Sequence, residues 1–343
     1  MELFAFDLSN ALKDQIALRL VKWGGTGRLR AVLIALPYLT IRAFFELMRG
    51  KIDVIHAQDA VLAPPAYLLS KLFGKPYTVV VHGLDLTYDN LLFKVTVPWA
   101  VRRADRVFCI SKAAAEAAEQ GGVTSSKLEI IPLAVTDNLH GHGDRQTLID
   151  RLQLSPKSRI LLTVGRLVKR KGVAWFIDAV MPALSSRYPE LVYVVVGEGE
   201  ERPAIEAAIA RHGLEKQVRL LGKVTDNLYE AAYNGADIFV MPNIVVPDDV
   251  EGFGLVLLEA STCALPVVAA GIQGIQDAVT DGQNGVLVPA EDTLAFQAAI
   301  ARFLDDPALA KQFGLRSREF TLSTYQWDKL AKRYVASYQK LIA

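Results

Sequence analysis

Short runs of apolar, mostly β-branched residues recur along the chain, and stretches with helical periodicity separate them. In the first part of the chain the runs lie at residues 52–56, 78–81, 107–110 and 130–133. In the second part they lie at residues 160–164, 191–196, 218–221, 238–241, 266–270 and 285–288. Runs that are apolar at successive positions are typical of strands buried on both faces of a parallel sheet. The alternation of strands and helices therefore predicts an α/β fold with doubly wound sheets.

Residues 136–158 interrupt this pattern with a polar stretch that contains two glycines and a proline. A chain of 343 residues exceeds the size at which one core usually keeps growing, so two domains are expected. We predict an N-terminal domain at residues 1–145, a C-terminal domain at 146–326, and a last helix at 327–343. The last helix has apolar positions at Leu330, Tyr334, Tyr338 and Leu341. This helical stripe is expected to pack back on the N-terminal domain.

The composition excludes several classes of protein. Lys and Arg total 38 against 37 Asp and Glu, so no bulk positive charge indicates nucleic acid as a partner. The two cysteines, Cys109 and Cys263, are far apart in apolar runs and indicate neither a disulfide framework nor a metal site. The amino terminus lacks the pattern of a secretory signal, and Pro37 and three polar residues interrupt the apolar segment 31–48. We therefore expect a cytoplasmic protein without a membrane-spanning helix.

The segment GRLVKRKG at residues 165–172 directly follows an apolar strand and precedes a helix. Open α/β sheets bind ligands at such loops, and the following helix offers free amides and a positive dipole end. The loop carries four cations, Arg166, Lys169, Arg170 and Lys171. Arginine can bind a phosphate bidentately and lysine acts as a point charge, so the pattern favours a diphosphate ligand. A solvated basic loop is the other interpretation.

The segment EGFGLVLLEA at residues 251–260 is the second candidate site. Its glycines let the backbone approach a ligand, and the amides of Leu255 and Val256 are placed to face a phosphate. Glu251 stands before the helix and Glu259 inside it, and two acceptors at different depths suit ribose and hexose hydroxyls. An acid beside a helix start can also simply complement the helix dipole. That interpretation leaves Glu259, in an apolar run, without an explanation.

Around these two segments the chain contains VVVGEGEER, VRLLGKV, ADIFVMPN, PVVAAGIQGIQDAV and GQNGVLV in order. With this series, and with seven residues between the two glutamates, the chain resembles a family 4 glycosyltransferase of the two-domain GT-B type. The likeness covers nearly the whole C-terminal half. It implies two Rossmann-like domains and a retaining transfer of a hexose-type sugar from a UDP- or GDP-sugar, with no cofactor and no metal. The implied acceptor is a glycan or a lipid-linked molecule of the kind used in surface polysaccharide or glycolipid synthesis.

The resemblance also implies roles for individual residues. Arg166 and Lys171 hold the donor diphosphate, Glu259 takes the ribose hydroxyls, and Glu251 meets the donor sugar. The backbone of four residues lies against the sugar and phosphate, and two further residues border the base. The first set is Phe253, Gly254, Leu255 and Val256, and the second is Lys223 and Val224.

The N-terminal half agrees with the family less fully. VVVHGLDLTY places His82 and Asp85 just after a strand and resembles the family's HGxD segment, in which the histidine approaches the transferred sugar. RADRVFCIS resembles a family strand that ends in a serine, here Ser111, which can cap the following helix. A lone histidine after a strand is more often structural. The assignment of His82 as catalytic, together with Glu251, therefore depends on the resemblance.

The start of the chain departs from the family pattern. The family normally opens with a strand and a Gly-Gly loop before its first helix, yet MELFAFDLSNAL already reads as that helix, with Phe4, Leu8 and Leu12 on one face. Gly24 and Gly25 come later, after the predicted strand IALRLVKW. We therefore expect an N-terminal domain that lacks its first strand, with poor transfer activity and a tendency to self-associate.

Other functions fit the sequence less well. No G-x-G-x-x-G turn is completed, which disfavours a nicotinamide dehydrogenase, and no G-x-S-x-G elbow indicates a hydrolase. No Asp-x-Asp occurs and the histidines are scattered, so a divalent metal has no obvious ligands. A protein that binds a nucleotide sugar, or serves as a scaffold, without transferring anything remains the alternative. The oligomeric state is not predicted.

The apolar stretch 33–47 allows two interpretations. Basic residues flank or interrupt it, and they are Arg28, Arg30, Arg42, Arg49 and Lys51. A basic, apolar helix can lie on a membrane surface and meet a lipid-linked acceptor. A helix that packs on the sheet is the other interpretation, and we favour it.

Overall fold

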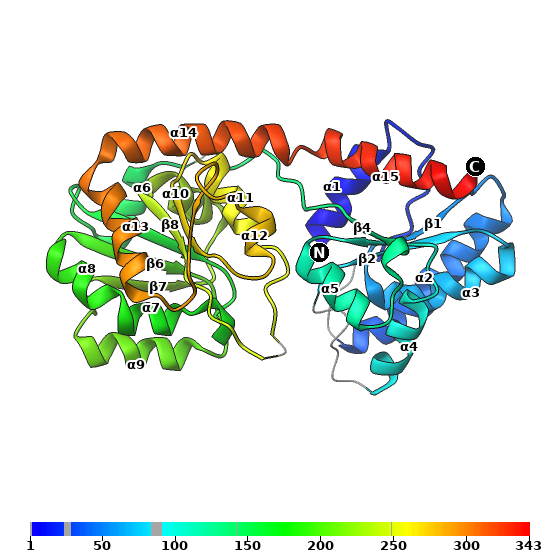
Figure 1. The fold of residues 1–343 in the computed structure, drawn as a ribbon, viewed down its shortest axis with the longest axis horizontal. Helices are drawn as coiled ribbons and strands as arrows, with labels where there is room; N and C mark the ends of the chain where they lie inside the picture. The colour runs from blue at the N-terminus through cyan, green and yellow to red at the C-terminus, as the bar shows by residue number, and fades with distance from the viewer. Residues whose placement is uncertain (1, 24–28, 84–90, 142, 248) are drawn as a thin grey trace. The chain divides into compact units, whose positions relative to one another are not determined.

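The computed structural model describes residues 2–23, 29–83, 91–141, 143–247 and 249–343. Its contacts divide the chain into two units, each built around one parallel sheet (Figure 1). The first unit comprises Met1–Ala134 and Trp327–Ala343, and the second comprises Val135–Gln326. The predicted fold class, two α/β domains with parallel sheets, is confirmed.

The second unit contains a six-stranded sheet in the order β10-β9-β8-β5-β6-β7, in which every neighbouring pair is parallel. The strands are β5 (Arg159–Val164), β6 (Leu191–Val196), β7 (Val218–Gly222), β8 (Ile238–Met241), β9 (Val267–Ala270) and β10 (Val286–Val288). The chain runs from β5 outward to β7 and then returns to the other side of β5 at β8. Open α/β sheets bind their ligands at such a switch point, here between β5 and β8.

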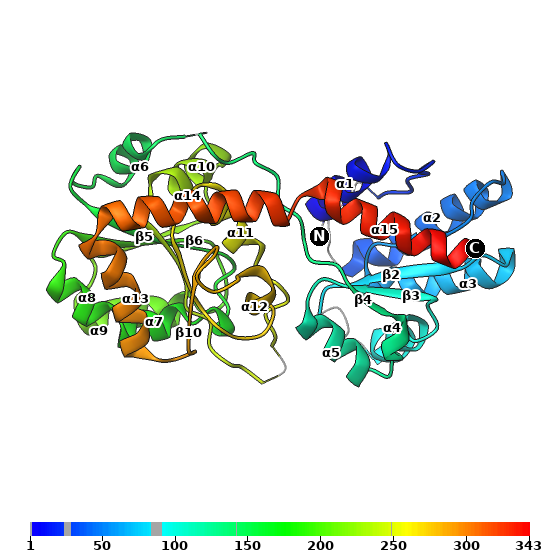
Figure 2. The ribbon, with the colours of Figure 1, turned by 45° about the horizontal axis from the view of Figure 1, so that its top comes forward.

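Helices cover both faces of this sheet (Figures 1 and 2). One layer contains α7 (Val173–Ala179), α8 (Met181–Arg187), α9 (Arg202–His212) and α13 (Thr293–Asp305). The other contains α6 (Arg145–Leu152), α10 (Asp226–Gly235), α11 (Leu255–Thr262) and α14 (Pro307–Thr324), and the short α12 is Ile275–Ala278. Phe176, Tyr193 and Phe296 are fully buried and in ring contact between α7, β6 and α13. This core holds the strands in place, so their carboxyl ends form a fixed platform for the loops.

The first unit contains a four-stranded parallel sheet in the order β1-β2-β3-β4. Its strands are β1 (Ile55–Ala57), β2 (Tyr77–Val81), β3 (Arg106–Cys109) and β4 (Leu128–Ile130). Its helices are α1 (Glu2–Leu12), α2 (Leu29–Met48), α3 (Ala63–Phe73), α4 (Leu91–Val101), α5 (Lys112–Gln120) and α15 (Trp327–Ile342). Short 3₁₀ turns lie at η1 (Ala60–Leu62) and η3 (Ser125–Lys127).

These helices pack on both faces of the sheet, because the side chains of successive strand residues point to opposite faces. Phe108 of β3 contacts Tyr334 of α15, with ring centroids 4.6 Å apart, and His56 of β1 lies 3.1 Å from the Tyr338 hydroxyl. On the opposite face the hydroxyl of Tyr77 in β2 donates to the Ala100 carbonyl of α4. The last helix of the chain therefore packs on the first unit.

The opening of the chain is helical, as the sequence predicts. Leu8 and Leu12 of α1 are buried. The predicted strand at residues 16–23 is wrong, because these residues form no strand and pair with no other segment of the described chain. Leu20 and Trp23 are exposed there. A strand needs a neighbour that pairs with its backbone amides and carbonyls, and no described segment provides one. Gly24 and Gly25 lie outside the described residues.

Candidate functional site

Two loops meet at the carboxyl ends of β5 and β8, at the switch point of the second sheet. The first is GRLVKRKG, which contains the 3₁₀ turn η4 (Lys169–Lys171), and the second leads from β8 to α11. Gly172 has φ +64°, and a Cβ there would lie 2.0 Å from the Pro242 carbonyl oxygen. The Ile244 amide donates to the Arg170 carbonyl at 2.9 Å. Only glycine allows this approach, which fixes one loop against the other.

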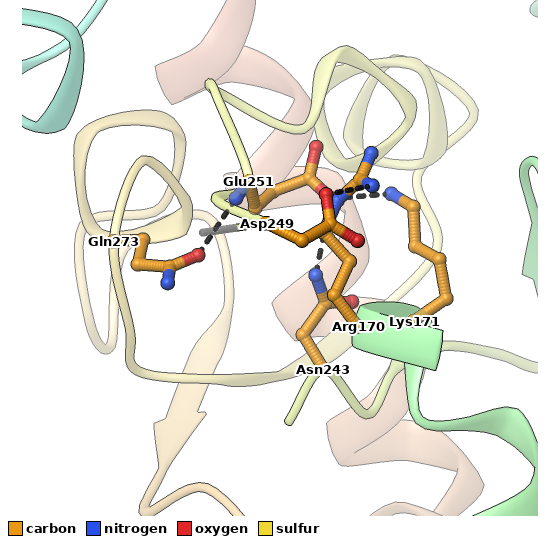
Figure 3. A network of polar contacts seen from close by, with 6 residues as sticks. All are labelled: Arg170, Lys171, Asn243, Asp249, Glu251 and Gln273. Atoms are coloured by element: carbon orange, nitrogen blue, oxygen red, sulfur yellow. Dashed lines mark hydrogen bonds and ion pairs between the residues drawn. The ribbon is translucent and has the colours of Figure 1, made fainter. Parts of the chain in front are cut away.

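A buried network of charged and polar side chains joins the two loops (Figure 3). Lys171 Nζ lies 2.7 Å from Glu251 Oε2, and Arg170 Nε lies 3.4 Å from the same oxygen. Asn243 Nδ2 also donates to Glu251 Oε2, at 3.0 Å. Arg170 turns its Nη1 to Asp249 Oδ1 at 2.7 Å. Three donors on one carboxylate oxygen set the orientation of Glu251 before any ligand arrives.

The backbone of Glu251 is held as well, because its amide donates to Gln273 Oε1 at 2.7 Å. No residue in the described ranges bonds to the other carboxylate oxygen, Glu251 Oε1. That oxygen is therefore the acceptor available to a hydroxyl. Asn243 is 1% exposed, and its Oδ1 has no partner among the described residues. A buried acceptor without a partner costs free energy, so a bound hydroxyl or water here would be stabilising.

The electrostatics of the network favour an ionised Glu251. Burial raises the pKa of its carboxyl, but the charge and hydrogen bond of Lys171, with Arg170 and Asn243, hold that pKa below its usual value. Burial lowers the pKa of the Lys171 amine, and the Glu251 carboxylate opposes this shift. Two cations and two carboxylates balance within the network, so its charge is neutral before a ligand binds.

Arg166 differs from its neighbours in the same loop. It is exposed and forms no ion pair with the described residues, whereas Arg170 is 7% exposed and engaged with Asp249 and Glu251. From the sequence we expected Arg170 to be one of the cations that a diphosphate would meet. In the structure, Arg170 instead holds the loop that carries Glu251.

Helix α11 begins beside this network. Gly254 caps it with φ +87°, and no side chain in the described part of the chain accepts from its first amides. Those amides belong to the turn that starts at Leu255 and Val256, both partly exposed. Phe253 is 2% exposed and packs edge-on against Tyr325, with centroids 6.2 Å apart. An uncapped helix start in this position can bind an anion.

Glu259 lies one turn further along α11 and is held by two tyrosines of α10. The hydroxyls of Tyr229 and Tyr233 donate to its Oε2 at 2.9 Å and 2.8 Å. Burial raises the pKa of the Glu259 carboxyl, and these two hydrogen bonds oppose the shift. No described residue bonds to Glu259 Oε1. The apolar run around Glu259 thus positions a carboxylate with one oxygen available to a ligand.

The remaining predicted residues occupy other places. Lys223 and Val224 follow β7, which lies at the edge of the second sheet and two strands from β5, or about 10 Å away at the usual strand spacing. His82 follows β2 in the first unit, where Nε2 lies 3.2 Å from the Gln58 carbonyl oxygen. Its ring meets Phe4 edge-on at 5.7 Å. Asp85 lies outside the described residues.

Some features of the site carry no signal in the sequence. Asn243 and Gln273 contact Glu251, and Asp249 contacts Arg170, only through the fold. Tyr229 and Tyr233, in contrast, are spaced i, i+4 on a predicted helix and could have been paired with a buried partner. Within the described residues, no group of three or more His, Cys, Asp or Glu side chains could hold a metal ion. In the same ranges, no helix is long and apolar enough to cross a membrane.

Comparison with protein families identifies the class of this protein. The sequence profile of Glycosyl transferases group 1 matches residues 144–320, more than half of the chain, and that of Glycosyltransferase Family 4 matches residues 2–139. The chain therefore belongs to the Glycosyl transferases group 1 family. It is a glycosyltransferase by family and fold.

Individual relatives agree with this assignment. The chain is 30% identical to a GDP-mannose-dependent alpha-(1-6)-phosphatidylinositol monomannoside mannosyltransferase of Mycolicibacterium smegmatis, over 86% of this chain and 78% of that protein. It is 27% identical to a glycogen synthase of Mycobacterium tuberculosis, over 87% of this chain and 72% of that protein. Among solved structures, Anabaena Alr3699/HepE in complex with UDP has a TM-score of 0.74 at 20% identity, covering 88% of this chain and 82% of that one.

Proposed function

We propose that this glycosyltransferase uses a nucleoside-diphosphate sugar, a UDP- or GDP-hexose, as its donor and binds it through the second unit. One observation carries the proposal. At the switch point of the sheet, the exposed Arg166, the paired Lys171 and the uncapped start of α11 present positive charge side by side with two oriented carboxylates. A diphosphate with sugars on both sides matches this arrangement, because its charge needs cations and amides while its hydroxyls need acceptors.

We assign the roles of Arg166, Lys171, Glu251 and Glu259 from their contacts and exposure, and those of Lys223 and Val224 from the family resemblance. Arg166 and the amides at the start of α11 bind the diphosphate, and Lys171 shares its charge between Glu251 and the phosphate. Glu251 Oε1 accepts from the donor sugar, and Glu259 Oε1 accepts from the ribose. Lys223 and Val224 border the base.

The chemical step places growing negative charge on the departing diphosphate. Groups that are oriented before the reaction stabilise such charge without reorganising, which is the largest contribution in many enzymes. Arg166 and Lys171 supply this stabilisation in our proposal, so no metal ion or cofactor is required. His82 contacts the transferred sugar, and the anomeric configuration is retained. The acceptor is a glycan or a lipid-linked molecule.

A transfer assay tests this proposal and separates it from the alternative of a non-catalytic binding protein. Purified enzyme is incubated with UDP- or GDP-hexoses and glycan or lipid acceptors, and release of the nucleoside diphosphate is measured with and without EDTA. We expect acceptor-dependent release that EDTA leaves intact. Nucleotide binding without release from any donor would favour the binding protein, and a strict Mg²⁺ requirement would contradict the metal-free site.

A further inference from the structure

Helix α2 carries a stripe of large apolar side chains that are exposed to solvent. The five residues are Ile34, Tyr38, Ile41, Phe45 and Met48, with exposed fractions from 41% to 65%. Their spacing alternates between four and three residues, which places them on one face of the helix. The other face of α2, which includes Phe44, packs against Phe73 of α3 with ring centroids 5.5 Å apart. The exposed stripe is therefore the outer face of a helix whose inner face is already used.

The neighbouring helices α3 and α4 extend this apolar surface. Leu68 and Leu72 of α3 are 64% and 65% exposed, and Val95 of α4 is 61% exposed. Trp99 of α4, which is 36% exposed, contacts Tyr67 of α3 with ring centroids 4.8 Å apart. Because α2 packs on α3 and α3 packs on α4, their outward faces adjoin (Figures 1 and 2). We call this surface the apolar face, and it consists of Ile34, Tyr38, Ile41, Phe45, Met48, Leu68, Leu72, Val95 and Trp99.

Basic residues accompany the apolar face. We count each helix together with the three residues that follow it. α2 then contains four Lys or Arg, α3 two and α4 three, which makes nine against the single acid Glu46. The whole chain has 38 Lys and Arg against 37 Asp and Glu. Outside these three segments it has 29 Lys and Arg against 36 Asp and Glu, so the rest of the chain is acidic. Arg42 and Lys71 are exposed, and the Arg103 guanidinium lies 4.2 Å from the ring centre of Trp99. Cations thus lie directly at the edge of the apolar residues.

Charge decides between the possible occupants of this face. A second copy of the chain, docked by the same surface, would bring two basic regions together and would be repelled. The surface of a bilayer that contains anionic lipid offers both an apolar interior for the side chains and negative headgroups for the cations. Tyr38 and Trp99 have the amphipathic rings that suit the boundary between headgroups and acyl chains.

We propose that the apolar face is a membrane-docking surface, by which the first unit lies on a bilayer rich in anionic phospholipid. The helix α2 lies in the plane of the interface with Ile41 and Phe45 inserted among the acyl chains, and Arg42 and Lys71 contact phosphate headgroups. Such docking brings the enzyme to lipid-linked acceptors. The inference does not depend on the donor site, because all of its residues belong to the first unit.

Vesicle co-sedimentation tests the proposal with the full chain. The probes are vesicles of phosphatidylcholine alone and of equimolar phosphatidylcholine and phosphatidylglycerol. We expect binding to the anionic vesicles and little to the neutral ones. The double variant Ile41→Ser with Phe45→Ser should weaken binding about 100-fold, since burial of each side chain is worth about tenfold. Its control is Leu294→Ser, at an exposed leucine of the second unit that is 75% exposed.

A second variant tests the electrostatic part. Arg42→Gln with Lys71→Gln should weaken binding to anionic vesicles about 30-fold, roughly fivefold for each charge, whereas Lys311→Gln on α14 should leave it unchanged. All substituted side chains are exposed, so each variant should keep the wild-type melting temperature, which calorimetry checks. Absence of binding to anionic vesicles, or equal binding by Ile41→Ser with Phe45→Ser, would overturn the proposal. Wild-type dimers that this double variant dissociates, without vesicle binding, would assign the face to a second copy instead.

Discussion

The buried pair formed by Lys171 and Glu251 allows a quantitative test of the site. Lys171→Met keeps most of the side-chain volume but removes the charge that lies 2.7 Å from Glu251 Oε2. The Glu251 carboxylate then stays buried with only Arg170 Nε, at 3.4 Å, and Asn243 as donors. Removing one partner of a buried pair typically costs about 3 kcal/mol or more. For a unit of this size, a loss of about 3 kcal/mol lowers the melting temperature by roughly 6 to 12 °C.

A double-mutant cycle assigns this loss to the pair. Glu251→Gln on top of Lys171→Met removes the uncompensated charge, so it should recover more than half of the lost stability, and scanning calorimetry of all four proteins measures it. Lys169→Met, an exposed lysine of the same loop, serves as the control and should change little. The reasoning is refuted if the two single changes add within about 0.5 kcal/mol, as independent sites do, or if Lys171→Met melts with the wild type.

Three further predictions concern other parts of the molecule. His82→Ala should lower turnover far more than donor affinity, as expected for a contact made in the transition state, and wild-type turnover would make His82 structural. Tyr229→Phe with Tyr233→Phe removes both donors that hold Glu259 and should weaken nucleotide binding about tenfold or more in titration calorimetry, so unchanged affinity would contradict the role of Glu259. Burial lowers the pKa of His56 to about 4 from 6.5. The unfolded chain therefore binds the proton at a higher pH than the folded one, and the free energy of unfolding of the first unit should fall by up to roughly 3 kcal/mol as the pH falls from 6.5 to about 4. His56→Gln should flatten this dependence in chemical unfolding, and a flat wild-type profile would contradict it.

Much of the fold can be predicted from local pattern. The strands at Leu191–Val196 and Ile238–Met241 have the predicted limits, because short apolar runs rich in β-branched and aromatic residues between turn residues favour a strand. The segment 16–23 shows the limit of this reasoning. Its apolar residues resemble a strand, but a strand also needs a neighbour, and local sequence does not say whether one is present.

The two loops of the candidate site could be predicted from the sequence, but most of the side-chain contacts between them could not. The spacing of GRLVKRKG and EGFGLVLLEA brings two loops to one edge of a parallel sheet, where Lys171 and Glu251 meet. Four adjacent cations in one loop do not reveal which of them face a ligand. Burial and pairing with Asp249 decide this for Arg170, whereas Arg166 remains exposed. Such choices depend on side chains far away in the sequence.

The central claim is that Arg166 and its neighbours bind the diphosphate of a nucleotide sugar, and titration calorimetry with UDP, GDP and their hexose conjugates tests it most directly. We predict that the wild-type protein binds at least one of these nucleotides. Arg166→Ala should weaken that binding about 10- to 150-fold, the equivalent of one hydrogen bond to a charged group, while the exposed Lys311→Ala leaves it unchanged. Failure of every nucleotide to bind, or equal affinity of Arg166→Ala and the wild type, would contradict the account.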